Sequence, residues 1–240
     1  MKIRNRVFIK DHLEKDLVVI LDQRATHYLF NVLRCKDGDY ISLFNESTEW
    51  ISRINKINSN EVEVLIEKNI KSYEKRQEIT LYFSPIKKNQ TELIIQKCTE
   101  IGVTHFQPVL MERTNFSSFN INRLNLIAIE AIEQSEQMRI PKIYEPIKLQ
   151  ELLSKDQENQ VTLVCSVKEN NNSIRNIVKK NSAANYSLMV GPEGDFSESE
   201  MKRIMNKESF FTISLGDTVL KSETASITAA AILKDILLND

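Results

Sequence analysis

Two short apolar runs, residues 186–190 and 210–215, each stop abruptly at a loop that contains glycine. The whole chain has only five glycines, and three of them, Gly191, Gly194 and Gly216, fall in these two loops. Glycine tolerates positive φ angles and lets other atoms approach the backbone closely. A helix start follows each loop, as in the strand–loop–helix units of parallel α/β sheets. The pattern therefore predicts a site made of main-chain atoms at the ends of two strands.

The helix starts behind these loops are specified locally. Ser197 and Glu200 form an S-x-x-E capping box, in which each side chain bonds the other residue's amide. Ser222 is the predicted N-cap of a final helix that runs to about Leu238. Two interpretations are open: ordinary βα turns, or a ligand site in the crevice at the carboxyl ends of the strands. The pairing of the two loops favours the ligand site.

Composition limits the class of protein. A chain of 240 residues with 41% apolar residues can form one large or two small domains. The formal net charge is −1, so any surface that binds a polyanion must be local. The first ten residues contain four basic and no acidic side chains, which form either such a local cluster or, as is usual for short basic ends, a solvated segment: Lys2, Arg4, Arg6 and Lys10.

Cysteine and histidine are few and scattered. The three cysteines, Cys35, Cys98 and Cys165, lie far apart, which argues against a disulfide framework and fits a reducing cytoplasm. The three histidines form no ligand pair, so no metal site is expected. No signal peptide and no apolar run near the length of a membrane span occurs. The sequence predicts a soluble cytoplasmic protein.

Residues 1–70 are predicted to be mainly β. Short runs rich in β-branched and aromatic residues alternate with polar turns, which indicates a small barrel or sandwich. One helical insert is expected at residues 25–34. The polar, charged segment 71–78 is expected to be a linker. The strands are expected at 6–9, 17–21, 40–44, 49–57 and 61–66.

From residue 79 the pattern changes to alternating strands and helices, which predicts a mostly parallel sheet covered on both faces. Besides the two runs described first, strands are expected at 79–84, 103–110 and 161–167. Besides the two helices already described, helices are expected at 89–101, 122–137, 149–154 and 173–180.

The ligand can be narrowed by exclusion. Neither the G-x-x-x-x-G-K-[ST] string of nucleotide hydrolases nor the G-x-G-x-x-G turn of Rossmann enzymes occurs, which disfavours both classes. Glu193 and Asp195 in the first loop would repel a phosphate. A ligand with positive charge, or an apolar purine that forms hydrogen bonds, matches the loops better.

Five groups of short strings occur in one order over nearly the whole chain. They are H-Y-L, V-L-R and G-D within 27–39, I-Q-K-C-T-E-I-G-V at 95–103, E-A-I-E-Q-S and R-I-P within 130–141, V-G-P-E-G at 190–194, and L-G with L-K-S-E-T-A within 215–225. In these strings the chain resembles the RsmE family, the 16S ribosomal RNA uridine-N3 methyltransferases of the SPOUT class. The resemblance implies an α/β fold: a PUA-like β-barrel over 1–70, and a SPOUT domain over 79–240 whose carboxyl-terminal segment threads a trefoil knot.

The resemblance also implies a cofactor and partners. Family members bind S-adenosylmethionine, act on 16S rRNA of the small ribosomal subunit and form homodimers. For the dimer interface, apolar residues of the helices at 122–137 and after 222 are candidates: Leu126, Ile129, Ile132, Ile227, Ile232 and Ile236. The residues that the resemblance implies around the cofactor are Val190, Gly191, Pro192, Glu193, Gly194, Ile213, Ser214, Leu215, Gly216, Leu220, Ser222 and Ala225.

Methylation of uridine N3 requires loss of a weakly acidic proton, so a base or an oxyanion-stabilising group is needed. Glu223 is the candidate base or base-orienting group, and Lys221 or Arg34 would stabilise charge on the uracil oxygens. The alternative for Glu223 is a first-turn residue favoured by the helix dipole. Candidate RNA contacts are Arg4, Arg6, His27, Arg34 and Lys36, although His27 could instead be a packing residue.

The chain departs from the family at four positions where arginine is usual: Gln90, Gln137, Thr218 and Lys221. Lysine keeps the charge of arginine but not its planar fork of donors. The alternative function is therefore a non-catalytic RNA-binding or ribosome-assembly protein that retains the SPOUT fold.

Overall fold

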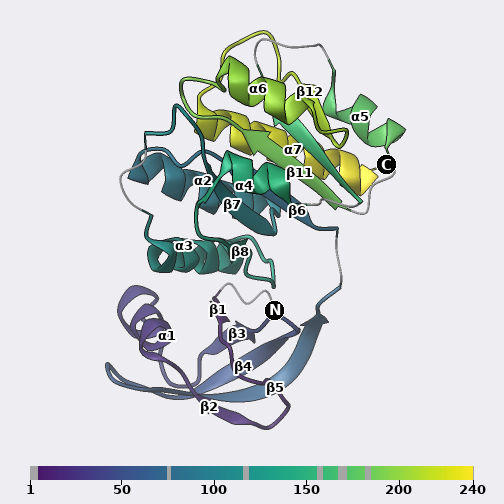
Figure 1. The fold of residues 1–240 in the computed structure, drawn as a ribbon. Coiled ribbons are helices and arrows are strands. Elements are labelled where there is room, and N and C mark those ends of the chain that lie inside the picture. Colours follow the sequence, from purple (N-terminus) through teal and green to yellow (C-terminus); the bar gives the residue numbers. More distant parts are fainter. Residues whose placement is uncertain are drawn as a thin grey trace. The chain divides into compact units, whose positions relative to one another are not determined.

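The computed structural model describes residues 5–74, 77–115, 119–155, 159–166, 172–181 and 185–239 (Figure 1). The chain divides into two compact units. The first contains residues 1–75 and 132–140, and the second contains residues 76–131 and 141–240. Segment 132–140, distant in sequence, thus clusters with the amino-terminal part of the chain.

The first unit is built on one five-stranded sheet, with the strands in the order β1-β3-β4-β5-β2. β1 pairs parallel with β3, and the remaining pairs are antiparallel. The five predicted strands are confirmed, and the described strands form a single sheet rather than the two sheets of a sandwich. β5 extends into the segment predicted as a linker. The bounds are β1 Arg6–Phe8, β2 Val18–Ile20, β3 Tyr40–Phe44, β4 Thr48–Ile57 and β5 Val62–Ser72.

The predicted helical insert is present as two consecutive elements. Helix α1 (Gln23–His27) begins after Asp22, whose carboxylate accepts a hydrogen bond from the amide of Ala25. It continues as a π-helical turn, η1 (Tyr28–Val32). Ala25 and Leu29 are buried in the core of this unit, which ties the insert to the sheet.

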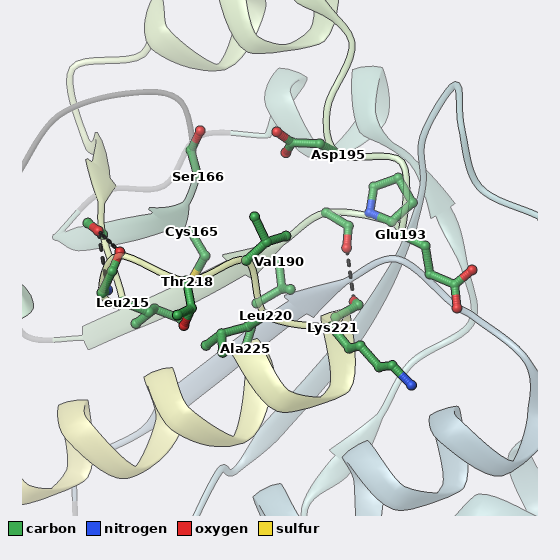
Figure 2. Close-up of a pocket in the computed structure, with 16 residues that line it drawn as sticks. Cys165, Ser166, Val190, Glu193, Asp195, Leu215, Thr218, Leu220, Lys221 and Ala225 are labelled. Atoms are coloured by element: carbon green, nitrogen blue, oxygen red, sulfur yellow. Dashed lines mark hydrogen bonds between the residues drawn. The ribbon is translucent and has the colours of Figure 1, made fainter.

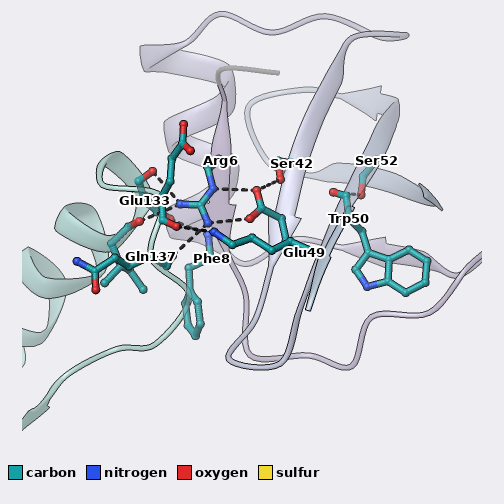
Figure 3. Close-up of polar contacts among 11 residues, drawn as sticks. Arg6, Phe8, Ser42, Glu49, Trp50, Ser52, Glu133 and Gln137 are labelled. Carbon is teal, nitrogen blue, oxygen red and sulfur yellow. Dashed lines mark hydrogen bonds and ion pairs between the residues drawn. The ribbon is translucent and has the colours of Figure 1, made fainter. Parts of the chain in front are cut away.

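A buried arginine connects β1 to residues 132–137, which belong to the same unit. Arg6 forms a bidentate ion pair with Glu49 of β4, with N–O distances of 2.8 and 2.9 Å. Its remaining donors bond the carbonyl oxygens of Ile132, Glu133 and Gln137 (Figure 3). Burial raises the pKa of the Glu49 carboxyl, but hydrogen bonds from Arg6 and Ser42 and the charge of Arg6 outweigh it and leave this pKa lowered. The ion pair is therefore a structural element of the first unit.

The second unit contains a sheet in the order β12-β10-β11-β6-β7-β8, with every pair parallel. The prediction of a mostly parallel sheet is confirmed. A short strand, β9 (Ile147–Lys148), pairs with β7 beside this path. The bounds of the others are β6 Ile79–Phe83, β7 His105–Leu110, β8 Lys142–Ile143, β10 Gln160–Cys165, β11 Asn185–Val190 and β12 Phe210–Ile213.

Helices cover both faces of this sheet. Alternate residues of β11 belong to different cores: Leu188 and Val190 pack with α2, α3, α5 and α7, whereas Met189 packs with α4 and α6. This alternation explains the continuous apolar runs of the strands. The bounds are α2 Lys88–Ile101, α3 Ile121–Gln134, α4 Leu149–Ser154, α5 Ile174–Lys180, α6 Glu198–Met205 and α7 Ser222–Asn239.

The observed helix ends match the predicted ones where a nearby residue, such as a glycine, determines the end. Gly102 ends α2 with a φ of 110°, as predicted for a glycine at this position. α2 begins one residue earlier than expected, after Lys87, which makes no side-chain cap. α3 ends at Gln134, three residues before its predicted end at Gln137. Position 167, the predicted end of β10, lies outside the described residues, and the trefoil knot stays a prediction.

Candidate functional site

Three parallel strands of the second unit end level with one another. Cys165 at the end of β10 is in register with Val190 of β11 and with Ile213 of β12. The ends of these strands and the loops after them, together with the start of α7, line an open-sided cavity of about 330 Å³ (Figure 2). The two glycine loops identified in the sequence therefore meet at one site, at the carboxyl edge of the sheet.

Ten of the twelve predicted cofactor residues line this cavity; Gly194 and Ile213 do not. Six further residues line it, of which Cys165 ends β10 and Ser166 follows it, on a strand that no glycine loop follows. Only the strand order could have identified these two, because β10 lies between β11 and β12. The other four additional residues are Asp195, Thr218, Val219 and Lys221.

The glycines of the two loops serve different purposes. Gly216 has a φ of 132°, so its backbone conformation requires glycine. A Cβ on Gly191 would lie 3.1 Å from the ring of Phe196, and one on Gly194 would lie 3.2 Å from Cδ of Arg113. The first loop therefore uses glycine for close packing against neighbouring side chains, and the second uses it for a turn.

A buried hydrogen bond connects the two loops. Oγ of Ser222 donates to the carbonyl oxygen of Gly191 at 2.9 Å. The prediction that Ser222 is an N-cap is wrong: it is the first residue of α7, and its hydroxyl is engaged across the site. The capping box at Ser197 and Glu200 of the preceding helix is confirmed.

The walls of the cavity are largely apolar, with polar groups in a few places. Figure 2 shows Val190, Leu220 and Ala225 close together, while the Lys221 side chain extends away from them. In the second loop, Ser214 and Gly216 bond each other, with Oγ of Ser214 donating to the Gly216 carbonyl at 2.9 Å. Such a site can hold a flat apolar group beside main-chain hydrogen-bonding atoms.

Two acidic residues of the first loop and one thiol complete the lining. Glu193 and Asp195 give the cavity negative charge without a phosphate-binding cation cluster. Burial raises the pKa of the Cys165 thiol to about 12, so this cysteine is neutral and unsuited to nucleophilic chemistry. The charge of the lining favours a cationic ligand over an anionic one.

The two candidate catalytic residues occupy different positions. Lys221 lines the cavity. Glu223, in the first turn of α7, is not among the lining residues, and it is half-buried. Its Oε2 is buried and, within the described part of the chain, has no hydrogen-bond partner. This carboxylate oxygen therefore has an unfilled acceptor position.

The candidate RNA contacts fall into three groups. Arg6 is buried in its ion pair with Glu49, so the prediction that it contacts RNA is wrong. Arg4 lies outside the described residues. His27, Arg34 and Lys36 are exposed on the first unit, so the alternative that His27 packs in a core is also wrong.

The described residues hold neither a metal-binding cluster nor a membrane-spanning helix. No group of three or more histidine, cysteine, aspartate or glutamate side chains there could hold a metal ion. Among the helices formed by those residues, none is long and apolar enough to span a membrane.

Comparisons with known proteins agree with this architecture. The model of an RNA methyltransferase domain matches residues 73–234, and that of an RNA methyltransferase PUA domain matches residues 21–67. Ribosomal RNA small subunit methyltransferase E of Rickettsia conorii is 34% identical over 95% of this chain and 93% of its own. The enzyme of the same name from Buchnera aphidicola subsp. Schizaphis graminum is 31% identical over 95% of each chain.

A solved structure shares the whole fold. Ribosomal RNA small subunit methyltransferase E from Neisseria gonorrhoeae, crystallised bound to S-adenosyl methionine, superimposes with a TM-score of 0.88. It is 26% identical, and the match covers 97% of both chains. The α/β fold with an amino-terminal PUA domain is therefore shared across both units. This chain belongs to the RNA methyltransferase family that includes ribosomal RNA small subunit methyltransferase E.

Proposed function

We propose that the protein transfers a methyl group from S-adenosylmethionine to N3 of a uridine in 16S ribosomal RNA. The observation that carries this proposal is the cavity at the ends of β10, β11 and β12, where the two glycine loops meet. The curated relatives named as small-subunit rRNA methyltransferases support the reaction, and the relative bound to S-adenosyl methionine supports the cofactor.

The cavity fits this cofactor in size and chemistry. Its volume of about 330 Å³ lies at the lower end of the range for small-molecule sites, roughly 300–1,000 Å³. Val190, Leu220 and Ala225 offer apolar surface for an adenine ring, and the main chain of Leu215, between the mutually bonded Ser214 and Gly216, offers hydrogen-bonding groups. Glu193 and Asp195 suit the positive charge of a sulfonium. When bound, S-adenosylmethionine supplies an electrophilic methyl group.

The residues at the start of α7 would handle the proton and the charge of the acceptor base. N3 of uridine carries a proton that must leave when N3 gains the methyl group. Glu223 accepts this proton, which agrees with the absence of a hydrogen-bond partner for its Oε2 among the described residues. Lys221, on the lining of the cavity, stabilises negative charge on the uracil oxygens.

The first unit would hold the RNA. Arg34 and Lys36 are exposed cations beside the π-helical turn, and His27 is exposed within the same insert. Cations of this kind bind phosphates without reading base sequence. Because N3 is hidden in a base pair, the target uridine must be unpaired. A ribosomal substrate places the protein in the cytoplasm.

A homodimer is the assembly that family resemblance favours. Ile132 and Ile236, predicted for the interface, are buried within the chain itself and cannot form it. Leu126 and Ile232 are 41% and 38% exposed, and Leu238 at the end of α7 is 66% exposed. These residues are candidates for an apolar contact between copies. Light scattering at micromolar concentration should give twice the mass of one chain.

Two measurements test the proposed reaction. Calorimetry of the purified protein with S-adenosylmethionine should show binding to one site per chain. Mass spectrometry of 16S rRNA should show a methylated uridine that is missing from cells lacking the gene and restored by its return. If the folded protein does not bind S-adenosylmethionine, the proposed reaction is excluded. Cofactor binding without any change in rRNA would favour the non-catalytic alternative, which the four missing arginines motivate.

A further inference from the structure

Arg113 lies outside the cavity lining, yet its side chain covers the loop that follows β11. Its guanidinium donates a hydrogen bond to the carbonyl oxygen of Gly194. Its aliphatic stem also crosses that residue: a Cβ on Gly194 would lie 3.2 Å from Cδ of Arg113 and 3.6 Å from its Cβ. The absence of a side chain at position 194 thus allows the arginine to lie flat against the loop.

The segment that presents Arg113 is anchored on both sides. A turn closes with a hydrogen bond from the amide of Thr114 to the carbonyl of Met111. Met111 is buried, and Oγ1 of Thr114 lies 2.7 Å from Oγ of Ser84. These contacts fix the backbone of the 111–114 turn, which carries Arg113.

The capping box of α6 anchors the same turn. The carboxylate of Glu200, which is 1% exposed, accepts hydrogen bonds from the amides of Ser197 and Glu112. Oγ of Ser199 donates to the Glu112 side chain at 2.7 Å. Glu200 is part of the capping box of α6, and it also fixes the position of Glu112, the residue before Arg113.

The loop that Arg113 covers has a conformation that needs support. Asp195, which lines the cavity, has a φ of 61°, a left-handed conformation that non-glycine residues adopt at a cost of roughly 1–2 kcal/mol. Its amide donates to the carbonyl of Pro192, closing a turn at 192–195. Such conformations persist when surrounding contacts determine them. The contact at Gly194 lies inside this turn.

We propose that Arg113 is a positioning residue for the cofactor loop. By binding the carbonyl oxygen of Gly194 and packing over its Cα, it holds the 192–195 turn in the shape that lines the cavity. This inference rests on the proposed function, because it assigns to Arg113 a role in the affinity for S-adenosylmethionine. Arg113 lies outside the cavity lining and acts on it through the carbonyl oxygen of Gly194.

Two substitutions separate the parts of this contact. Arg113→Met keeps an aliphatic stem and removes the hydrogen bond, and Arg113→Ala removes both. Arg203→Ala is the matched control, because it deletes an exposed arginine that pairs with Glu112 but does not reach the loop. Calorimetry should show the Kd for S-adenosylmethionine rising about tenfold in Arg113→Ala and about threefold in Arg113→Met, as expected for partial loss of one hydrogen bond and its packing. Arg203→Ala should stay within about twofold of wild type by the same measure.

A positioning role also predicts which kinetic constant changes. KM for S-adenosylmethionine should rise in Arg113→Ala while KM for RNA and the melting temperature stay close to those of wild type. A general loss of structure would instead lower the melting temperature and alter both constants. Arg113→Lys, which keeps the stem and a donor, should recover part of the affinity.

A double substitution provides the decisive test. Gly194→Ala introduces a methyl group against the Arg113 stem and should weaken cofactor binding on its own. In the Arg113→Ala background the close contact with Cδ is gone and the methyl group keeps only an ordinary contact of 3.6 Å with Cβ of residue 113, so the two effects should not add. If the effects of the two substitutions on the Kd for S-adenosylmethionine add, the positioning role is overturned. It is also overturned if wild type binds the cofactor and Arg113→Ala binds it with the same Kd. A folded wild-type protein that fails to bind the cofactor would instead overturn the proposed function.

Discussion

The hydroxyl of Ser222 donates a hydrogen bond of 2.9 Å to the carbonyl oxygen of Gly191, 31 residues earlier in the chain. This bond is buried and joins the loop after β11 to the first turn of α7. Both residues line the cavity. The two loops of the candidate cofactor site are thereby fixed relative to each other by one side chain.

Removing this hydroxyl should loosen the site. Ser222→Ala leaves the buried carbonyl of Gly191 without its donor, which costs about 1–2 kcal/mol. We expect the affinity for S-adenosylmethionine to fall about fivefold or more, measured by calorimetry, since 1.4 kcal/mol corresponds to a factor of about ten. Ser222→Thr retains the hydroxyl and is the control. Equal affinity in Ser222→Ala and wild type would show that the bond does not hold the site.

Glu223→Gln should separate binding from catalysis. The substitution keeps the size of the side chain and removes its ability to take a proton. We expect kcat for RNA methylation to fall by about 10²–10⁴, the usual contribution of a general base. The Kd for S-adenosylmethionine should stay within about twofold of wild type, because Glu223 does not line the cavity. Turnover at the wild-type rate would eliminate the proposed role and favour the helix-dipole alternative.

The Arg6–Glu49 pair should make stability depend on pH. The pKa of Glu49 is lowered in the folded protein below its ordinary value of 4.5, so the unfolded chain binds more protons as pH falls through this window. The contribution of Glu49 to the free energy of unfolding is therefore fully present above pH 4.5 and is lost progressively below it. Urea unfolding from pH 3 to 7 measures this loss.

Glu49→Gln provides the comparison for the same experiment. Near neutral pH it leaves the buried Arg6 charge without its partner, which should cost about 3 kcal/mol. The difference from wild type should shrink as pH falls below 4.5, because wild-type Glu49 is then also neutral. Glu67→Gln, which breaks the half-exposed pair with Arg53, should change stability by less than about 1 kcal/mol. A difference that does not vary with pH would contradict the assignment.

We propose that exposed cations of the first unit bind RNA phosphates, so Arg34→Glu should lower the affinity of the protein for RNA. Losing one phosphate contact should reduce the slope of log affinity against log salt by about one. Filter binding of a 16S rRNA fragment over a range of salt concentrations measures both quantities. Lys56→Glu reverses another exposed charge, one that pairs with Glu61, and serves as the control. If both variants bind RNA equally well and with equal slopes, Arg34 is not at the interface.

Several features of this protein could be predicted because their causes are local. The capping box at Ser197 and Glu200 spans four residues, and Gly102 ends its helix through its own backbone. The alternation of strands and helices after residue 79 was enough to predict the parallel sheet. The two glycine loops identified most of the cavity, because their strands pair with a common neighbour, β10.

Other features arise from contacts between residues far apart in the chain, which no local pattern records. Arg6 has the sequence context of an exposed basic residue, but Glu49 and three carbonyl groups at 132–137 surround it. Ser222 has the local pattern of an N-cap, but Gly191 offers its hydroxyl a buried acceptor.

The sequence by itself determined which loops form the site and which family the chain resembles, because glycine, capping and strand signals act over a few residues. Only the tertiary structure decided what holds those loops in place: Ser222 across the site and Arg113 over Gly194. The physical reason is that a hydrogen bond between distant segments depends on where the sheet brings them, and that position is a property of the packed core.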